Sequence, residues 1–413
     1  MYLIFGKGRS GLAASRLLQS KGIPHFLADD KTPNWEELLK KVHTVVVSPG
    51  IKPTHRVFKL SKDLKRELIG ETELAYRFWR GDIVAITGTD GKTTTTRLTY
   101  LVLKNSLSGV YEGGNIGVPF SEIVSKTESG IAVLEVSSFQ GYTLKTFRPD
   151  VGAFISFSED HLDWHTDIRD YLEGKYRIFR NQRREDFLLL NGSVEEIRKT
   201  PSKAKKLFFL SEDADIRLSD GWVVFKSEKL FEVSKLKLRG IHNVWNASVS
   251  AVIGRIFGVS ISAIREVLYS FEGLPHRLQF LGRFRGVEVY NDSKSTTPHS
   301  LSAALNSFDK KVILLFGGKD KGADFSPLAS LFGEKVKLAV AYGENRFKLK
   351  RQVGGSAPIL LEETLEGALK RVIPLLEEGD ILLLSPGSAS FDQFQSYEER
   401  GEVFMSLVRE FME

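Results

Sequence analysis

A short loop at residues 88–93, with the sequence Gly-Thr-Asp-Gly-Lys-Thr, constrains this chain more than any other feature. The apolar residues 83–86 before it predict a buried strand, and residues 94–104 after it predict a helix. A loop at this position presents free backbone N–H groups and the positive end of the helix dipole to a phosphate. Lys92 would then reach the outer phosphates, and the Thr93 hydroxyl would bind Mg2+. The loop is shorter than the full G-x-x-x-x-G-K-[ST] pattern, because Ile86 replaces its first glycine; the alternative is a tight turn with an exposed lysine.

Composition indicates a globular protein with more than one domain. The 413 residues are too many for one core, and 42% of them are hydrophobic, which is enough for several cores. The net charge of +6 suits anionic substrates such as nucleotides, and the absence of cysteine excludes disulfides and thiolate metal sites. We expect a cytoplasmic protein, because no apolar stretch could span a bilayer and no leader precedes the strand-like residues 2–5.

Strands and helices alternate along three segments and predict an α/β protein with three domains. These are a Rossmann-like domain at 1–80, a central P-loop ATPase-type domain at 81–274 and a Rossmann-like domain at 275–413. The first begins with G-x-G-x-x-G at residues 6–11, followed by Asp29 and Asp30, which is typical of a nucleotide site. We expect strands at 2–5, 25–28, 44–47, 83–86, 131–136, 151–155, 187–190, 287–290, 312–316, 336–342 and 381–384, and helices ending near 20 and at 94–104, 168–182, 242–257 and 262–270. Parallel sheets of this kind are covered on both faces and bind ligands at the carboxyl ends of their strands.

Several side chains that follow the central strands are candidates for metal binding. Glu135 ends a predicted strand beside the phosphate loop, where it could complete the Mg2+ shell or simply face solvent. His161 and His165 show H-x-x-x-H spacing, a weak zinc signal because the glutamate of H-E-x-x-H is absent. His161 alone could equally be a ligand for a second cation or a hydrogen-bonded loop residue. Lys175, judged from its helix alone, is a surface lysine.

Polar loops in the third segment predict a substrate site. Three such loops follow strands, at 291–296, 317–324 and 385–390. Each alone could be a turn, but three at one sheet edge suit an acidic substrate. Arg277 follows the linker 273–275 and could place its planar guanidinium on a phosphate. Asn246 shares a helix face with Asn243 and could bind an adenine edge, although Asn243 could instead cap the helix.

In combination, these motifs resemble those of the Mur ligase family over essentially the whole chain. The matching stretches are Gly88-Thr89-x-Gly91-Lys92-Thr93, Leu134-Glu135-Val136-Ser137-Ser138, Asp160-His161, His242-Asn243-x-x-Asn246 and His276-Arg277. The stretches that resemble the D-glutamate-adding branch are 114–117, 137–140, 291–294 with Thr296, and 385–386 with 390–394. The D-N-P-R motif of the diaminopimelate-adding branch is absent. Asp90 and Tyr397 depart from the family, in which asparagine and phenylalanine are frequent at these positions.

The resemblance implies an ATP-dependent amide ligase of peptidoglycan precursor synthesis, which adds D-glutamate to UDP-N-acetylmuramoyl-L-alanine. The substrate carboxylate would attack the γ-phosphorus of ATP, and the D-glutamate amine would then displace phosphate from the acyl phosphate. ATP would be the co-substrate and two Mg2+ ions the cofactors. The enzyme would be a monomer that needs domain closure for catalysis and binds neither nucleic acid nor membrane.

The resemblance also implies roles for individual residues. ATP would contact Gly88, Thr89, Asp90, Gly91, Lys92, Thr93, Thr94, Asn246, Arg277 and Asp292. The UDP substrate would contact Gly8, Arg9, Ser10, Gly11, Asp29, Ser48, Pro49, Gly50 and Asn115, and D-glutamate would contact Lys294, Thr296, Lys321, Ser390 and Tyr397. The metal ligands would be Thr93, Glu135, His161 and Lys175, the last as a carbamate, whose negative charge can hold a cation. Lys92, His161, Lys175 and Lys321 would be the catalytic residues.

Two other classes of protein are compatible with parts of the sequence. A Rossmann dehydrogenase would explain residues 6–30, but it leaves the loop at 88–93 without a role. A nucleic-acid-binding module would suit the basic charge, but the densest basic run, 52–66, reads as a solvated helix face and no aromatic residues interleave with a basic stripe. Binding of NAD without ATP turnover would favour the first class.

Overall fold

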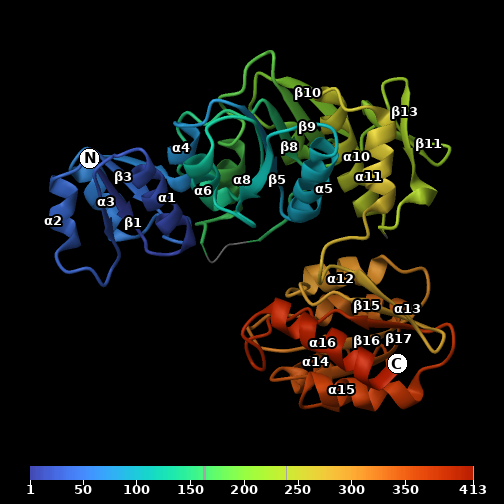
Figure 1. Ribbon diagram of the computed structural model, residues 1–413. Helices are drawn as coiled ribbons and strands as arrows, with labels where there is room; N and C mark the ends of the chain where they lie inside the picture. Colours follow the sequence, from blue (N-terminus) through green and yellow to red (C-terminus); the bar gives the residue numbers. More distant parts are fainter. Residues whose placement is uncertain (161–163, 239, 413) are drawn as a thin grey trace. The chain divides into compact units, whose positions relative to one another are not determined.

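The computed structural model describes residues 1–160, 164–238 and 240–412. The chain forms two compact units, one of Met1–Leu236 with Trp245–Ser270 and the other of Lys237–Val244 with Phe271–Glu413. The described strands form three sheets, coloured blue, teal to yellow-green, and orange to red in Figure 1. In the described part of the chain, no helix is long and apolar enough to cross a membrane.

The first sheet has four parallel strands in the order β2-β1-β3-β4. Its elements are β1 (Tyr2–Phe5), α1 (Arg9–Ser20), β2 (His25–Ala28), α2 (Trp35–Lys40), β3 (Thr44–Val47), α3 (Arg56–Asp63), β4 (Glu67–Gly70) and α4 (Glu71–Tyr76). The three strands predicted here are confirmed. A Cβ atom at Gly11 would lie 1.8 Å from the Gly6 carbonyl oxygen, so glycine lets α1 start directly against the end of β1.

The central sheet has nine strands in the order β13-β12-β11-β10-β9-β8-β5-β7-β6. The strands are β5 (Asp82–Thr87), β6 (Val110–Gly114), β7 (Ile131–Glu135), β8 (Val151–Phe154), β9 (Phe187–Asn191), β10 (Lys205–Phe209), β11 (Ile216–Ser219), β12 (Trp222–Phe225) and β13 (Glu228–Glu232). The helices are α5 (Lys92–Lys104), α6 (Phe120–Lys126), α7 (Ser138–Gly141), α8 (Ile168–Tyr176), α9 (Glu195–Arg198), α10 (Ile241–Ile256) and α11 (Ile261–Ser270), with a short 3-10 helix η1 (Val233–Lys235). The sheet is parallel up to β11, and β11, β12 and β13 form an antiparallel edge.

One predicted helix in this unit is too long. The helix expected at 168–182 ends at Tyr176, and the N–H groups of Ile178, Phe179 and Gln182 bond to carbonyls three residues earlier. This tighter winding turns Ile178 and Phe179 into the core that covers the sheet.

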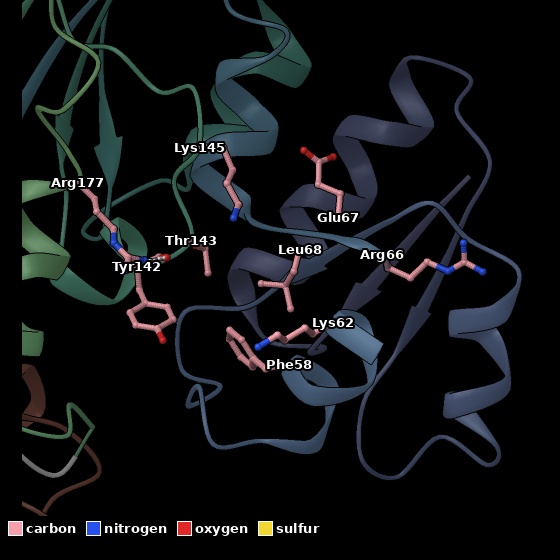
Figure 2. A pocket seen from close by; sticks show the side chains of 9 residues that line it. All are labelled: Phe58, Lys62, Arg66, Glu67, Leu68, Tyr142, Thr143, Lys145 and Arg177. Carbon is pink, nitrogen blue, oxygen red and sulfur yellow. Dashed lines mark hydrogen bonds between the residues drawn. The ribbon is translucent and has the colours of Figure 1, made fainter. Parts of the chain in front are cut away.

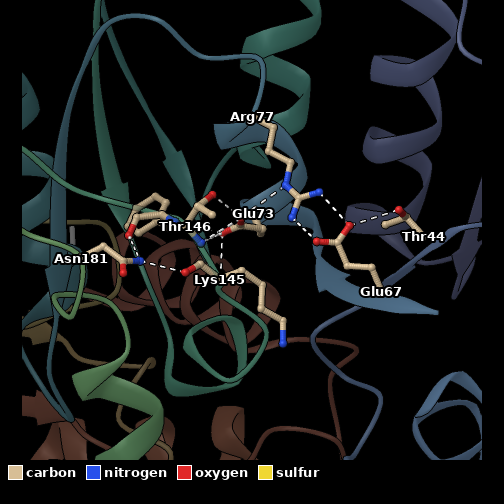
Figure 3. A network of polar contacts seen from close by, with 8 residues as sticks. Thr44, Glu67, Glu73, Arg77, Lys145, Thr146 and Asn181 are labelled. Atoms are coloured by element: carbon tan, nitrogen blue, oxygen red, sulfur yellow. Dashed lines mark hydrogen bonds and ion pairs between the residues drawn. The ribbon is translucent and has the colours of Figure 1, made fainter. Parts of the chain in front are cut away.

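The buried carboxylate of Glu73 ties α4 to the segment that leads into β8. It accepts hydrogen bonds from the backbone N–H groups of Lys145, Thr146 and Phe147 at 3.0 Å each, and from the Thr146 hydroxyl at 2.6 Å. Arg77 contacts Glu73 at 3.3 Å and also forms two short bonds to Glu67 (Figure 3). One apolar core includes side chains from both α1 and the central sheet, so the first two sheets are joined by polar and apolar contacts alike.

The second unit contains a six-stranded sheet in the order β14-β15-β19-β16-β17-β18. Its strands are β14 (Gln279–Phe284), β15 (Val287–Asn291), β16 (Val312–Gly317), β17 (Val336–Tyr342), β18 (Ile359–Glu362) and β19 (Ile381–Leu384). Its helices are α12 (Pro298–Asn306), α13 (Ala329–Lys335), α14 (Arg346–Val353), α15 (Leu365–Val372) and α16 (Tyr397–Met412), with 3-10 helices η2 (Ser326–Leu328) and η3 (Ile373–Leu375). Apolar clusters cover both faces, as predicted. The expectation of a purely parallel sheet is wrong at one edge, where β14 runs antiparallel to β15.

Candidate active site

The loop at 88–93 lies between β5 and α5, as the sequence predicts. Gly91 precedes the first residue of α5 with a φ of 78°, and a Cβ atom there would lie 2.7 Å from the Asn246 side-chain oxygen. Only glycine fits this left-handed, crowded position without strain. The Asp90 N–H donates to the Ser156 hydroxyl at 2.8 Å, which fastens the loop to the segment after β8. The ammonium of Lys92 bonds to the Thr89 carbonyl oxygen at 2.6 Å.

Thr93 and Glu135 meet at the first turn of α5. The Thr93 hydroxyl donates to Glu135 Oε2 at 2.9 Å, and the Asn115 amide donates to Glu135 Oε1 at the same distance. Glu135 is only 2% exposed, so its carboxylate does not face solvent. A hydroxyl and a buried carboxylate in contact are hard oxygen donors, and they fit Mg2+ at the mouth of a phosphate loop. Within the described residues, no three His, Cys, Asp or Glu side chains form a cluster that could hold a metal ion.

The prediction from helix pattern alone that Lys175 is a surface residue is wrong. Its side chain is 1% exposed and donates to the Gly88 carbonyl oxygen at 2.7 Å, because α8 turns this face toward the phosphate loop. Burial, with a contribution from the positive charge of Lys92, lowers the pKa of Lys175 well below its ordinary value. A neutral amine is the form that reacts with carbon dioxide, so this environment suits the carbamate that the family resemblance implies.

His165 has a structural position that excludes the zinc-pair interpretation. Its ring is 3% exposed, and both ring nitrogens are engaged: Nδ1 with Asp170 Oδ2 at 3.0 Å and Nε2 with the Ser138 hydroxyl at 2.9 Å. The ring therefore links the N-terminus of α8 to the N-terminus of α7. His161, the other histidine of the pair, lies outside the described residues.

Most residues predicted to bind the UDP substrate follow β1, β2 and β3 at one edge of the first sheet. One more lies in the loop after β6. They are Gly8, Arg9, Ser10 and Gly11 after β1, Asp29 after β2, Ser48, Pro49 and Gly50 after β3, and Asn115 after β6. The guanidinium of Arg9 donates to the Gly117 carbonyl oxygen, which brings the first and last of these loops together. The Thr32 hydroxyl and Lys7 hold the pKa of Asp29 below its ordinary value, so this carboxylate is charged at neutral pH.

The three polar loops of the second unit converge, as predicted, around a residue that the sequence reading missed. Arg400 is fully buried and donates to the Ser293 hydroxyl at 2.9 Å and to the Ser388 carbonyl oxygen at 2.9 Å. The Lys319 N–H donates to the Ala389 carbonyl oxygen at 2.9 Å. A signal was present in the sequence, because Arg400 lies on the same face of α16 as the apolar Phe404, Leu407 and Val408. An arginine on a buried stripe needs buried acceptors.

Asp292 lies at the centre of this unit's polar edge. Its carboxyl group accepts from the Leu278 N–H at 3.1 Å and from the Ser385 hydroxyl at 2.8 Å. Burial raises the pKa of Asp292 to about 7, against the opposing effect of these two bonds and of the positive charge on Arg277. Asp292 is therefore a hydrogen-bonding group whose charge depends on pH near neutrality.

The residues predicted to bind D-glutamate occupy the same edge. The ammonium of Lys294 lies 5.0 Å from the centre of the Tyr397 ring, and that of Lys321 lies 5.3 Å from the Phe391 ring. Ser390 is buried and Thr296 half-buried. Their roles stay predictions.

Comparison with known proteins adds independent evidence. A family model described as the Mur ligase middle domain matches residues 86–254, and one described as Mur ligase, glutamate ligase domain, matches residues 276–387. Two relatives named UDP-N-acetylmuramoylalanine--D-glutamate ligase, from Aquifex aeolicus (strain VF5) and Hydrogenobaculum sp. (strain Y04AAS1), are 53% and 45% identical. The first alignment covers 98% of both chains, and the second covers 99% of this chain and 98% of the relative.

Solved structures show the same fold at low sequence identity. A pseudomurein peptide ligase type C from Methanothermus fervidus has a TM-score of 0.63 and 17% identity over 99% of both chains. MurF ligase from Thermotoga maritima, solved in complex with ADP, has a TM-score of 0.63 and 19% identity over 89% of this chain and 90% of that chain. These similarities confirm the predicted α/β fold class.

Proposed function

The chain belongs to the Mur ligase family, and on that premise we propose that it joins D-glutamate to UDP-N-acetylmuramoyl-L-alanine with ATP as co-substrate. The product is a peptidoglycan precursor. We assign residues 1–80 to the UDP substrate, 81–274 to ATP and 275–413 to the amino acid. The single observation that carries the proposal is the contact of Thr93 with the buried Glu135 at the phosphate loop, beside the buried Lys175.

The reaction requires two anions to meet. The N–H groups of residues 88–93 and the ammonium of Lys92 hold the outer phosphates of ATP, while the carboxylate of the muramoyl substrate attacks the γ-phosphorus. The resulting acyl phosphate is attacked by the amine of D-glutamate, and inorganic phosphate leaves. Lys92 is half-buried and lies beside the buried Glu135 and Lys175, so water screens its charge less than at an exposed surface.

Two Mg2+ ions complete the proposed site. Thr93 and Glu135 would hold one, and His161 with carbamylated Lys175 would hold the second. Bound Mg2+ supplies the positive charge that lets the substrate carboxylate approach the triphosphate. A lysine ammonium would repel a cation at the second position, whereas a carbamate attracts it.

The second unit supplies the remaining contacts. Asp292 and Arg277 bind the nucleotide, and Lys321, Lys294, Thr296, Ser390 and Tyr397 bind D-glutamate. Buried Arg400 positions two of the loops that carry these side chains, because it bonds to Ser293 and Ser388.

Phosphate release from ATP tests the proposal. With UDP-N-acetylmuramoyl-L-alanine present, we expect release with D-glutamate and little with other amino acids or none. Lys92→Ala should abolish release yet leave binding of the UDP substrate intact, as measured by calorimetry. Lys104→Ala, at the exposed end of the same helix, is the matched control and should retain activity. Equal loss of release and of UDP-substrate binding in Lys92→Ala would contradict the assignment of separate domains to the two substrates.

A further inference from the structure

A pocket of about 340 Å3 lies along the open edge of β4, and none of the residues proposed above lines it. It is lined by α3, by the start of β4, by the residues that follow α7 and by the C-cap of α8 (Figure 2). Phe58, Leu68 and Tyr142 provide apolar walls, and Lys62, Lys145 and Arg177 provide positive charge. The proposed UDP-binding loops follow the carboxyl ends of β1 to β3, whereas Glu67, also in this lining, pairs with Thr44 at the opposite end of the sheet.

Arg177 pairs with Glu173 at 3.5 Å, but the two lysines of the pocket form no ion pair among the described residues. Among the described residues, the ammonium groups of Lys62 and Lys145 have no hydrogen bond or ion pair, and both side chains are exposed. Glu67 is the acidic residue of the lining, but its carboxylate accepts two bonds from Arg77, at 2.6 and 2.9 Å. That guanidinium is the main reason why the pKa of Glu67 is lowered, so Glu67 is already paired.

The pocket walls are held in place without using the two lysine ammonium groups. The Arg177 guanidinium donates to the Tyr142 carbonyl oxygen at 2.7 Å and lies 4.8 Å from the centre of the Tyr142 ring. The backbone of Lys145 is fixed by Glu73. The rings of Phe58 and Tyr142 meet edge to face, with centroids 6.3 Å apart. Figure 2 shows the fourth cation, Arg66, turned away, and its guanidinium is occupied by the Leu39 and Lys40 carbonyl oxygens.

We propose that this pocket is a second anion site, which binds a small phosphate monoester with a flat apolar group. Two unpaired ammonium groups and a partly shared guanidinium match the double negative charge of a phosphate monoester. The edge-to-face aromatic wall offers apolar contact for the rest of the molecule. A compact inorganic anion would contact only the positively charged groups, and a neutral aromatic compound would contact only the aromatic wall.

The pocket is next to the helices of the proposed metal site. Tyr142 directly follows α7, and Arg177 caps α8, the helix that carries Lys175. These helices are in close contact, because a Cβ atom at Gly141 would lie 1.9 Å from the Gly174 carbonyl oxygen. An occupant that recruits Arg177 would therefore act on α8, and this coupling to turnover rests on the proposed function.

Lysine footprinting of the wild-type protein tests the site directly. The protein is acetylated with and without phenyl phosphate, and each lysine is read by peptide mass spectrometry. At about ten times its Kd, phenyl phosphate should slow acetylation of Lys62 and Lys145 by about tenfold, because an occupied lysine is blocked. Inorganic phosphate should protect only at higher concentration, and phenol should not protect. Lys41, the C-cap of α2, and Lys59, in α3, are exposed lysines outside the pocket, and their rates should not change.

A double variant separates site binding from general charge. Lys62→Ala with Lys145→Ala should weaken phenyl phosphate binding by about tenfold or more, because each lost charged contact accounts for a several-fold change. Lys41→Ala with Lys59→Ala removes the same charge and should bind normally. Equal protection of all four lysines, or equal protection by phenol, would overturn the site, whatever the enzyme's activity. A turnover rate that phenyl phosphate changes in wild type but not in the pocket variant would support the coupling, and an unchanged wild-type rate would overturn it.

Discussion

Glu73→Ala is expected to loosen the junction between the first two sheets. The Glu73 carboxylate is fully buried and accepts from three consecutive backbone N–H groups and one hydroxyl (Figure 3). Alanine leaves these donors without an acceptor. Residues Lys145–Phe147 lie between α7 and β8. They therefore connect Glu135, at the end of β7, to β8, the strand that pairs with β5 before the phosphate loop.

The magnitude follows from the number and burial of the orphaned donors. The bond from the Phe147 N–H to Glu73 is buried, whereas the bonds from Lys145 and Thr146 are only partly buried. One buried N–H costs about 2 kcal/mol when it loses a charged acceptor, and the two partly buried N–H groups cost about 1 kcal/mol each. The hydroxyl of the exposed Thr146 can turn toward water at little cost, so the expected loss is about 4 kcal/mol. Glu73→Gln should lose almost as much, because an amide offers one acceptor atom and would point an N–H at another donor.

Hydrogen exchange at the amides of residues 145–147 measures this loss locally. A loss of about 4 kcal/mol corresponds to exchange about a thousandfold faster, provided that the segment opens on its own. Glu67→Ala is the matched control, since Glu67 also pairs with Arg77 but is 41% exposed at its side chain and should change stability by less than about 1 kcal/mol. Exchange in Glu73→Ala within about threefold of wild type would refute the reasoning.

Three further predictions concern single buried groups. Protein incubated with 13C-bicarbonate should show a carbamate resonance that disappears in Lys175→Met, because burial keeps the Lys175 amine neutral and reactive; a spectrum without this resonance would remove Lys175 from the metal ligands. Because burial raises the pKa of Asp292 to about 7 from an ordinary 3.8, the folded protein holds this proton more tightly than the unfolded chain, so the stabilisation is complete below about pH 4 and is lost as pH rises through 7. In urea unfolding, the free energy of unfolding of Asp292→Asn should rise relative to that of wild type by up to about 4 kcal/mol between pH 4 and 8. Parallel pH dependences of the two proteins would contradict this. His165→Ala should lower stability by about 2 kcal/mol in thermal unfolding, because the buried Ser138 and the half-buried Asp170 each lose a partner, and an unchanged Tm would argue against the bridge.

The parts of the fold that the sequence predicted well are those with strong local signals. Apolar runs such as 44–47 and 312–316 are buried on both faces and flanked by turn residues, so they read as parallel strands. Several strands away from the parallel centres of the sheets were missed, because their sequence signals are mixed. β11 is mostly exposed beyond its first residue, and β14 contains no fully buried residue, so neither shows an apolar run or a clear alternation.

Some residues of the proposed site could also be located from local sequence signals, and others could not. Residues 88–93 could be located because a phosphate loop needs glycine and lysine at fixed spacing, whatever surrounds it. The environment of Lys175 could not be predicted, because α8 buries it against the phosphate loop, which is 87 positions earlier in the sequence. The contact is the hydrogen bond from Lys175 to the Gly88 carbonyl oxygen. Its role as a carbamate came only from the family resemblance.

Buried polar side chains in this chain connect segments that are distant in sequence, and this explains why local patterns do not reveal them. Glu73 holds residues 145–147, Arg400 holds Ser293 and Ser388, and His165 holds Ser138. Each is a group that is costly to bury unless its partners are present, so each specifies an arrangement of loops that apolar packing alone would leave free. The apolar pattern thus sets where the strands and helices lie, and these few polar groups set where the loops with the proposed chemistry come to rest.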